Sequence, residues 1–149
     1  MILTKKGLDL PISGAPSADI DSSTTINTIA ILGPDYVGLK PTMLVKEGDR
    51  VSSGQKLFED KKNPGTYITS PSSGVVESIN RGEKRRFLSM TIDVDDSIEP
   101  TKFIATDYES PVKFLVDTGA LSYFKTRPYN RIPSKEDSPN AVFINACDT

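Results

Sequence analysis

Short apolar segments separated by glycine-rich turns fill residues 40–94, and this spacing constrains the fold more than any other feature of the sequence. Glycine tolerates the positive φ that tight turns require, and residues 87–94 alternate with the period of two typical of a half-buried strand. We expect strands at 28–32, 43–45, 55–59, 67–69, 75–79 and 87–94. Two turn-centred hairpin units, 48–54 and 65–74, form a weak internal repeat. The sequence therefore predicts a mainly β module, a small flattened barrel of two interlocked halves.

A helix is predicted in the region that follows this module. Ser110 can cap the first turn, and Pro111 suits the first helical position. Three apolar residues would share one face of this helix: Val112, Leu115 and Val116. Gly119 is the expected C-cap, and a shorter helical piece should follow through Leu121 and Phe124.

Four regions follow from these patterns. Residues 1–27 are expected to form an N-terminal strand and arm, 28–98 the β module, and 99–140 a helical linker region. The continuous apolar run 141–146 is typical of a buried parallel strand, so 141–149 is predicted to be the first strand of a truncated α/β domain. The predicted class is mainly β with an α/β remainder.

Composition excludes several kinds of chemistry. The 149 residues include no histidine and one cysteine, Cys147. Zinc sites built on histidine or cysteine pairs, Ser–His–Asp catalysis, cysteine-ligated iron–sulfur clusters and internal disulfides are therefore not expected. A formal net charge of -2 does not indicate binding to nucleic acid. No apolar run is long enough for direct membrane insertion. We expect a soluble, cytoplasmic chain.

Residues 40–74 resemble the biotinyl/lipoyl-type barrel-sandwich hybrid fold. The resemblance rests on the segments 45–57 and 70–76. Carrier domains of that type hold a modified lysine at a hairpin tip, where Lys61 and Lys62 stand here. Carriers flank that lysine with small or apolar residues, whereas Asn63 and Pro64 follow here, so two solvated turn lysines are the preferred interpretation. A lipoyl- or biotinyl-type carrier is the alternative.

Blocks spread over nearly the whole chain resemble one family. They are residues 7–16, 32–41, 58–65, 79–85 and 126–128. They are similar to the N-terminal part of the A-subunit of the sodium-translocating NADH:quinone oxidoreductase (Na⁺-NQR). The resemblance implies a peripheral subunit on the cytoplasmic face of the bacterial inner membrane, docked on membrane subunits, chiefly the B-subunit. The complex is an enzyme that reduces ubiquinone and transports sodium, and this fragment alone is not expected to be catalytic.

The motifs that would hold a cofactor are altered in this chain. Residues 13–16 resemble the Ser-Gly-Ala-Thr motif by which sister subunits hold FMN covalently, but Pro16 lacks the hydroxyl that the phosphoester needs. In residues 118–128, bulky side chains replace the glycines of a phosphate-binding loop. We expect no cofactor here; FMN, riboflavin, FAD and iron–sulfur centres are implied for the partner subunits.

Two segments are candidates for a partner or ubiquinone surface. The first is Tyr36, Val37, Gly38 and Lys40, where an aromatic and an aliphatic residue adjoin a permissive glycine. The second contains Arg127 and Tyr129, residue types enriched at interfaces. A plain loop with Tyr36 packed on the barrel, a solvated connector, and a solubilising turn at the basic run 84–86 are the structural alternatives.

Overall fold

The computed structural model describes residues 13–15 and 17–144, which fall into two compact units. The larger unit is Ile26–Asp137, and the smaller combines Met1–Thr25 with Ser138–Thr149. The described residues of the smaller unit contain no regular helix or strand. A strand and an arm are predicted within residues 1–27. Residues 13–15 and 17–27 contain no strand, and residues 1–12 lie outside the described part of the chain.

Residues 141–144 are not assigned to a strand, and residues 145 and 146 lie outside the described part of the chain, so the terminal strand stays a prediction. Val142, Phe143 and Ile144 are 57%, 84% and 84% exposed. A buried strand needs neighbours to satisfy its backbone N–H and C=O groups, and no described strand pairs with this segment.

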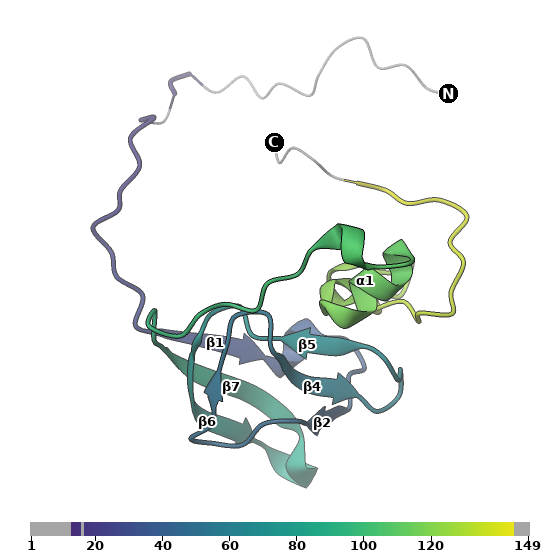
Figure 1. Ribbon diagram of the computed structural model, residues 1–149, viewed down its shortest axis with the longest axis horizontal. Helices are drawn as coiled ribbons and strands as arrows, with labels where there is room; N and C mark the ends of the chain where they lie inside the picture. The colour runs from purple at the N-terminus through teal and green to yellow at the C-terminus, as the bar shows by residue number, and fades with distance from the viewer. Residues whose placement is uncertain (1–12, 16, 145–149) are drawn as a thin grey trace. The chain divides into compact units, whose positions relative to one another are not determined.

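Two antiparallel sheets form the β module (Figure 1). The four-stranded sheet runs in the order β1 (Thr28–Leu32), β7 (Phe87–Val94), β6 (Gly74–Arg81) and β3 (Arg50–Val51). The three-stranded sheet runs in the order β2 (Pro41–Met43), β4 (Lys56–Asp60) and β5 (Tyr67–Thr69). Neighbouring strands that are far apart in sequence, such as β1 and β7, interlock the two halves of the chain.

The mainly β prediction is confirmed, and three strands have the predicted bounds: 28–32, 67–69 and 87–94. The strands β4 and β6 each begin one residue from the expected position, and β6 continues to Arg81. The strand β2 begins two residues before the predicted segment 43–45, although the N–H of Leu44 still donates to the carbonyl of Leu57 at 2.9 Å. Pairing therefore continues beyond the end of the regular strand.

The hydrophobic core lies between the two sheets. The rings of Phe58 on β4 and Phe87 on β7 meet edge to face, with centroids 5.2 Å apart. The other buried core residues come from both sheets: Ile31, Val51, Leu57, Ile68, Val76, Met90 and Ile92. At Gly74 an added Cβ would lie 2.0 Å from the carbonyl oxygen of Asp93. The close approach of β6 and β7 therefore requires glycine at that position.

The predicted helix is present as α1 (Pro111–Asp117), which Figure 1 shows next to β5. The hydroxyl of Ser110 accepts a hydrogen bond from the N–H of Lys113 at 3.2 Å, as expected of an N-cap. Gly119 ends the helix with φ +75°, and the short helical piece η4 (Ala120–Tyr123) follows.

The helical region contacts the three-stranded sheet through its C-terminal end. Leu121 is buried, and an added Cβ at Gly119 would lie 2.5 Å from Cγ2 of Thr69. Leu115 and Val116 are half-buried, as predicted, but Val112 is 47% exposed. The three residues have the helical spacing expected of one face, but only the later two are covered.

Candidate functional site

The loop 36–39 connects the short helix η1 (Gly33–Asp35) to β2 and projects one apolar side chain outward. Tyr36 and Leu39 are half-buried against the core, whereas Val37 is 49% exposed. The N–H of Leu39 donates to the carbonyl of Tyr36 at 3.2 Å, and Gly38 has φ +80°. Two inward side chains and a tight turn thus hold Val37 at the surface.

Asp60, at the end of β4, fixes this loop to the β4–β5 hairpin tip. Its side chain is buried, and Oδ1 accepts hydrogen bonds from the N–H groups of Lys40 and Lys62, each at 3.0 Å. The N–H of Lys61 donates to the carbonyl of Lys40 at 2.9 Å. A buried carboxylate satisfied by two backbone donors leaves these two segments little freedom to separate.

A third segment, residues 131–133, closes against the same tip. The side-chain amide of Asn63 donates to the carbonyl of Pro133 at 3.0 Å, and Ile132 packs against the core. Arg131 precedes this contact and is exposed. The loop, the hairpin tip and the connector therefore form one continuous surface from three distant parts of the sequence.

Two open depressions flank the loop and share Val37, Gly38 and Leu39. The first, of about 260 Å³, is also lined by Gly33, Pro34, Tyr36, Pro41, Arg86 and Phe87. The second, of about 180 Å³, is also lined by Asp60, Lys62, Asn63, Arg131 and Ile132. Both are smaller than the roughly 300–1,000 Å³ of typical small-molecule sites. The exposed side chain of Val37 thus lies between two depressions that each contain a cationic residue, Arg86 in the first and Lys62 and Arg131 in the second. This combination is suited to contact with another macromolecule.

The Tyr36 side chain adds a cation–aromatic contact to this surface. Nζ of Lys125 lies 5.3 Å from the ring centroid of Tyr36. Burial raises the pKa of Tyr36, and the nearby Tyr123 and Asp35 raise it further. Burial also lowers the pKa of Lys125, an effect that Asp35 opposes. Tyr36 is half-buried but Lys125 is exposed, so the contact between the ammonium group and the ring is of the weaker, solvent-accessible kind.

The first predicted segment contributes to this surface directly. Tyr36, Val37 and Gly38 line the depressions, and Lys40 joins through its backbone. The packing of Tyr36 on the barrel, which is the structural alternative for this loop, is also present. The two interpretations are compatible, because the inward tyrosine fixes the outward valine.

The second predicted segment lies in a turn of its own. The N–H of Thr126 donates to the carbonyl of Arg131 at 2.7 Å, and Tyr129 is 72% exposed. Neither Arg127 nor Tyr129 lines a depression; Arg131, whose guanidinium lies 6.0 Å from the Tyr129 ring centroid, does.

Sequence reasoning missed four residues that join the three segments: Asp60, Asn63, Lys125 and Ile132. The one available signal was local, because Asp and Asn in a turn commonly bond nearby backbone groups. Nothing in the sequence shows that Asp60 reaches back to Lys40, or that Asn63 bonds residues about seventy positions later.

The two hairpin lysines have exposed side chains, but their backbone is held. Lys62 lines the second depression, and the tip is attached to residues 132 and 133 through Asn63. Accessible side chains fit a carrier lysine and a turn lysine equally, so the interpretation of Lys61 and Lys62 as solvated turn residues stays a prediction.

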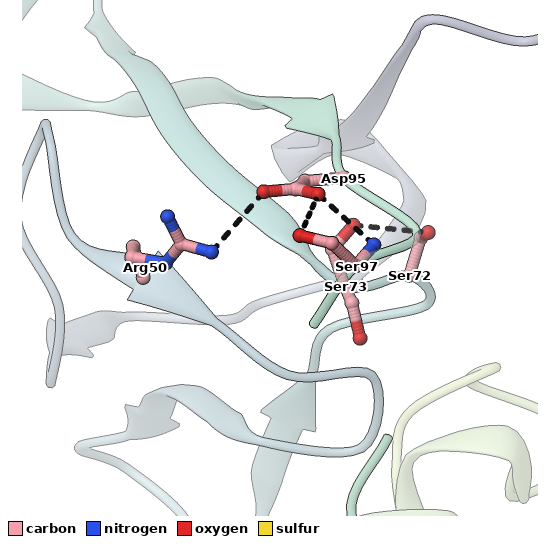
Figure 2. Close-up of polar contacts among 5 residues, drawn as sticks. All are labelled: Arg50, Ser72, Ser73, Asp95 and Ser97. Carbon is pink, nitrogen blue, oxygen red and sulfur yellow. Dashed lines mark hydrogen bonds and ion pairs between the residues drawn. The ribbon is translucent and has the colours of Figure 1, made fainter. Parts of the chain in front are cut away.

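A polar cluster at another edge of the module contains Arg50, Ser72, Ser73, Asp95 and Ser97 (Figure 2). A guanidinium nitrogen of Arg50 lies 3.2 Å from Oδ2 of Asp95, and the N–H of Asp95 donates to the carbonyl of Ser73 at 3.1 Å. Hydrogen bonds from the hydroxyl and N–H of Ser97, with a smaller contribution from Arg50, lower the pKa of Asp95. The cluster joins β3 to the end of β7 and has a structural explanation.

Of the two cofactor-like motifs, the structure describes one in part and the other in full. Pro16 lies outside the described residues, so the FMN-like motif is described only at 13–15. In 118–128, Leu121 and Ser122 are buried. Within the described residues, no group of three or more Asp, Glu, Cys or His side chains could hold a metal ion, and no helix is long and apolar enough to cross a membrane.

Comparison with known proteins identifies the family of this chain. The profile of the NqrA N-terminal barrel-sandwich hybrid domain matches residues 2–95, and that of the NqrA second alpha/beta domain matches residues 107–149.

Similar curated proteins are named as the A-subunit of Na(+)-translocating NADH-quinone reductase. The protein of Photorhabdus laumondii is 47% identical over 156 aligned positions, and those of Actinobacillus pleuropneumoniae serotype 5b and Haemophilus influenzae strain PittGG are each 46% identical. Each alignment covers 100% of this chain and 35% of the relative, so the chain spans about a third of the length of these relatives. The chain belongs to the NqrA family, and its β module is that family's N-terminal barrel-sandwich hybrid domain.

Proposed function

We propose that this chain is the N-terminal part of a docking subunit of a Na⁺-translocating NADH:quinone reductase. It contacts membrane subunits of the same complex, chiefly the B-subunit, on the cytoplasmic face of the bacterial inner membrane. Support comes from relatives named as the A-subunit of such a reductase, together with the surface built around Val37. The reductase and sodium-transport activities belong to the complex, and this part alone is not catalytic.

The observation that carries the docking role is the rigid presentation of Val37. The side chain is about half exposed, although the loop that bears it is fixed by packing and by Asp60. A preorganised apolar residue loses little entropy when a partner covers it, and cations at its edges can pair with carboxylates at the rim.

We also propose that the chain holds no cofactor, with FMN, riboflavin, FAD and iron–sulfur centres in partner subunits. This rests on Pro16 replacing the threonine of the FMN motif and on the buried side chains in 118–128. Ubiquinone contact is the finer part of the proposal. Because both depressions are open and small, a quinone would be enclosed here only if a membrane subunit closed the Val37 side.

The test uses the assembled complex with the full-length subunit. Val37→Glu should reduce both the incorporation of this protein into the complex and the quinone reductase activity, in proportion, because a charge would be buried at the interface. The matched control is Leu44→Glu, a residue that is 51% exposed and lines neither depression. Equal incorporation of both variants would contradict the docking role. Normal incorporation of Val37→Glu with a raised KM for ubiquinone would instead assign the surface to quinone.

A further inference from the structure

The turn between β6 and β7 concentrates positive charge in a chain whose net charge is -2. Lys84, Arg85 and Arg86 follow one another, and all three are exposed. Arg81, at the end of β6, is exposed as well, and Glu83 is the acidic residue among them. Neither the core nor a salt bridge found among the described residues involves these cations.

The backbone of this turn is unfavourable for the residues that it contains. Lys84 has φ 52° and Arg85 has φ 62°, and the N–H of Arg86 donates to the carbonyl of Glu83 at 3.1 Å. Positive φ at both central residues is the requirement of a type I′ hairpin turn, which Asn-Gly meets best. Residues with a Cβ crowd the backbone in this region. The sequence therefore keeps two long cationic side chains where a different pair would stabilise the turn.

The turn is nevertheless held in one conformation. The N–H of Gly82 donates to the carbonyl of Arg86 at 2.8 Å, and the N–H of Arg85 donates to the carbonyl of Gly82 at 3.1 Å. Arg86 also lines the first depression beside the Val37 loop. The backbone that bears these cations thus has a defined conformation at an edge of the candidate docking surface.

We propose that the β6–β7 turn is a preorganised cationic contact for fixed carboxylates on a partner subunit, extending the docking surface around Val37. The inference rests on the proposed docking function and names the chemistry of the partner. A fluid anionic lipid surface responds chiefly to the number of charges, which a flexible polybasic segment supplies equally well. A strained and hydrogen-bonded turn suits carboxylates at fixed positions, since preorganisation reduces the entropic cost of pairing.

The test replaces the central pair by the sequence that the turn prefers, Lys84→Asn with Arg85→Gly, in the full-length subunit. Hydrogen exchange in residues 79–94 should become slower, because the turn is relieved of steric crowding. Association with the detergent-solubilised complex lacking this subunit should nevertheless weaken about tenfold. The dependence of the dissociation constant on KCl concentration should also become shallower. A stabilised turn that binds less well separates charge recognition from damage to the fold.

Two variants control for charge alone and for side-chain identity. Lys46→Asn with Lys102→Asn removes two exposed cations elsewhere and should leave association unchanged. Lys84→Arg with Arg85→Lys keeps both charges and the turn, and should retain association and its salt dependence.

Three outcomes separate this inference from the docking function itself. If Val37→Glu weakens association and the Asn-Gly turn variant does not, the cationic contact is overturned and docking stands. If the turn variant weakens association and Val37→Glu does not, the cationic contact is supported and the role of Val37 is contradicted. If the turn variant lowers binding only to vesicles containing phosphatidylglycerol, a lipid surface replaces the proposed partner carboxylates.

Discussion

The two hairpin tips of the β module both carry adjacent basic residues, but in opposite structural settings. At the β4–β5 tip, Asp60 and Asn63 bond the backbone of neighbouring segments, and Gly65 takes the positive φ of 89°. At the β6–β7 turn, Lys84 and Arg85 occupy positive φ themselves. The first tip is organised for stability and the second for the display of charge. A basic run in a sequence does not distinguish these settings; its backbone conformation does.

The largest effect is expected at the carboxylate that holds the β4–β5 tip. Asp60→Ala leaves the N–H groups of Lys40 and Lys62 without their acceptor, so the free energy of unfolding should fall by about 2–4 kcal/mol. Urea denaturation of the chain would measure it. Asp60→Asn is the matched control, because both bonds end on Oδ1 and an amide oxygen can still accept them. Equal losses for Ala and Asn would remove Asp60 as the fixed point of this tip.

A second prediction compares the two turns by opposite signs. Gly65→Ala should destabilise the chain by about 1–2 kcal/mol, since Cβ would meet positive φ and lie 3.1 Å from Cδ of Lys135. Arg85→Gly should stabilise it by about 1 kcal/mol. Denaturation midpoints at constant m-value report both effects. Two changes of the same sign would show that the turns are not in different settings.

The β4–β5 tip also contains a buried hydroxyl group whose hydrogen bonding is not satisfied. Oγ1 of Thr66 is buried and has no hydrogen-bond partner within the described residues. Thr66→Val replaces the hydroxyl by a methyl group of similar size and should stabilise the chain by about 1 kcal/mol. Thr66→Ser keeps the hydroxyl and loses the methyl, so its midpoint in urea should fall. A destabilised Val variant would indicate that the hydroxyl has a partner after all.

The smallest effect concerns Tyr36 in the loop 36–39. Because the pKa of Tyr36 is raised in the folded chain, its stabilising contribution is present below pH about 10 and is lost as the pH rises above that value. Tyr36→Phe should therefore reduce the alkaline loss of stability, by less than about 1 kcal/mol.

The lowered pKa of Lys125 acts in the opposite direction, since its penalty is relieved as the pH rises. Lys125→Met should therefore steepen the alkaline loss. Unfolding measured between neutral and alkaline pH distinguishes the two slopes, and parallel profiles for both variants would contradict the assignment.

Local patterns predicted the parts of the fold that local forces determine. The alternation in 87–94, the Ser110 cap and the turn at Gly119 appear as expected because each depends on neighbouring residues. The strand at 141–146 stays a prediction, because a strand depends on a partner strand and no described strand pairs with residues 141–144.

The candidate surface was predictable only in its outward loop. Val37 could be found from its neighbours, but the contacts of Asp60 with Lys40 and of Asn63 with Pro133 join segments far apart in the sequence. The crowding at Lys84 and Arg85 was also invisible, since their basic side chains suggest an ordinary solvated turn and only φ reveals the cost.

Cross-linking in the assembled complex tests the central claim most directly. A photoactivatable amino acid placed at position 37 of the full-length subunit, with the same group at position 44 as control, would report which surface meets the membrane subunits. We predict cross-links from position 37 to a membrane subunit, chiefly the B-subunit, with none from position 44. Cross-links from position 44 alone would contradict the docking role of the Val37 surface.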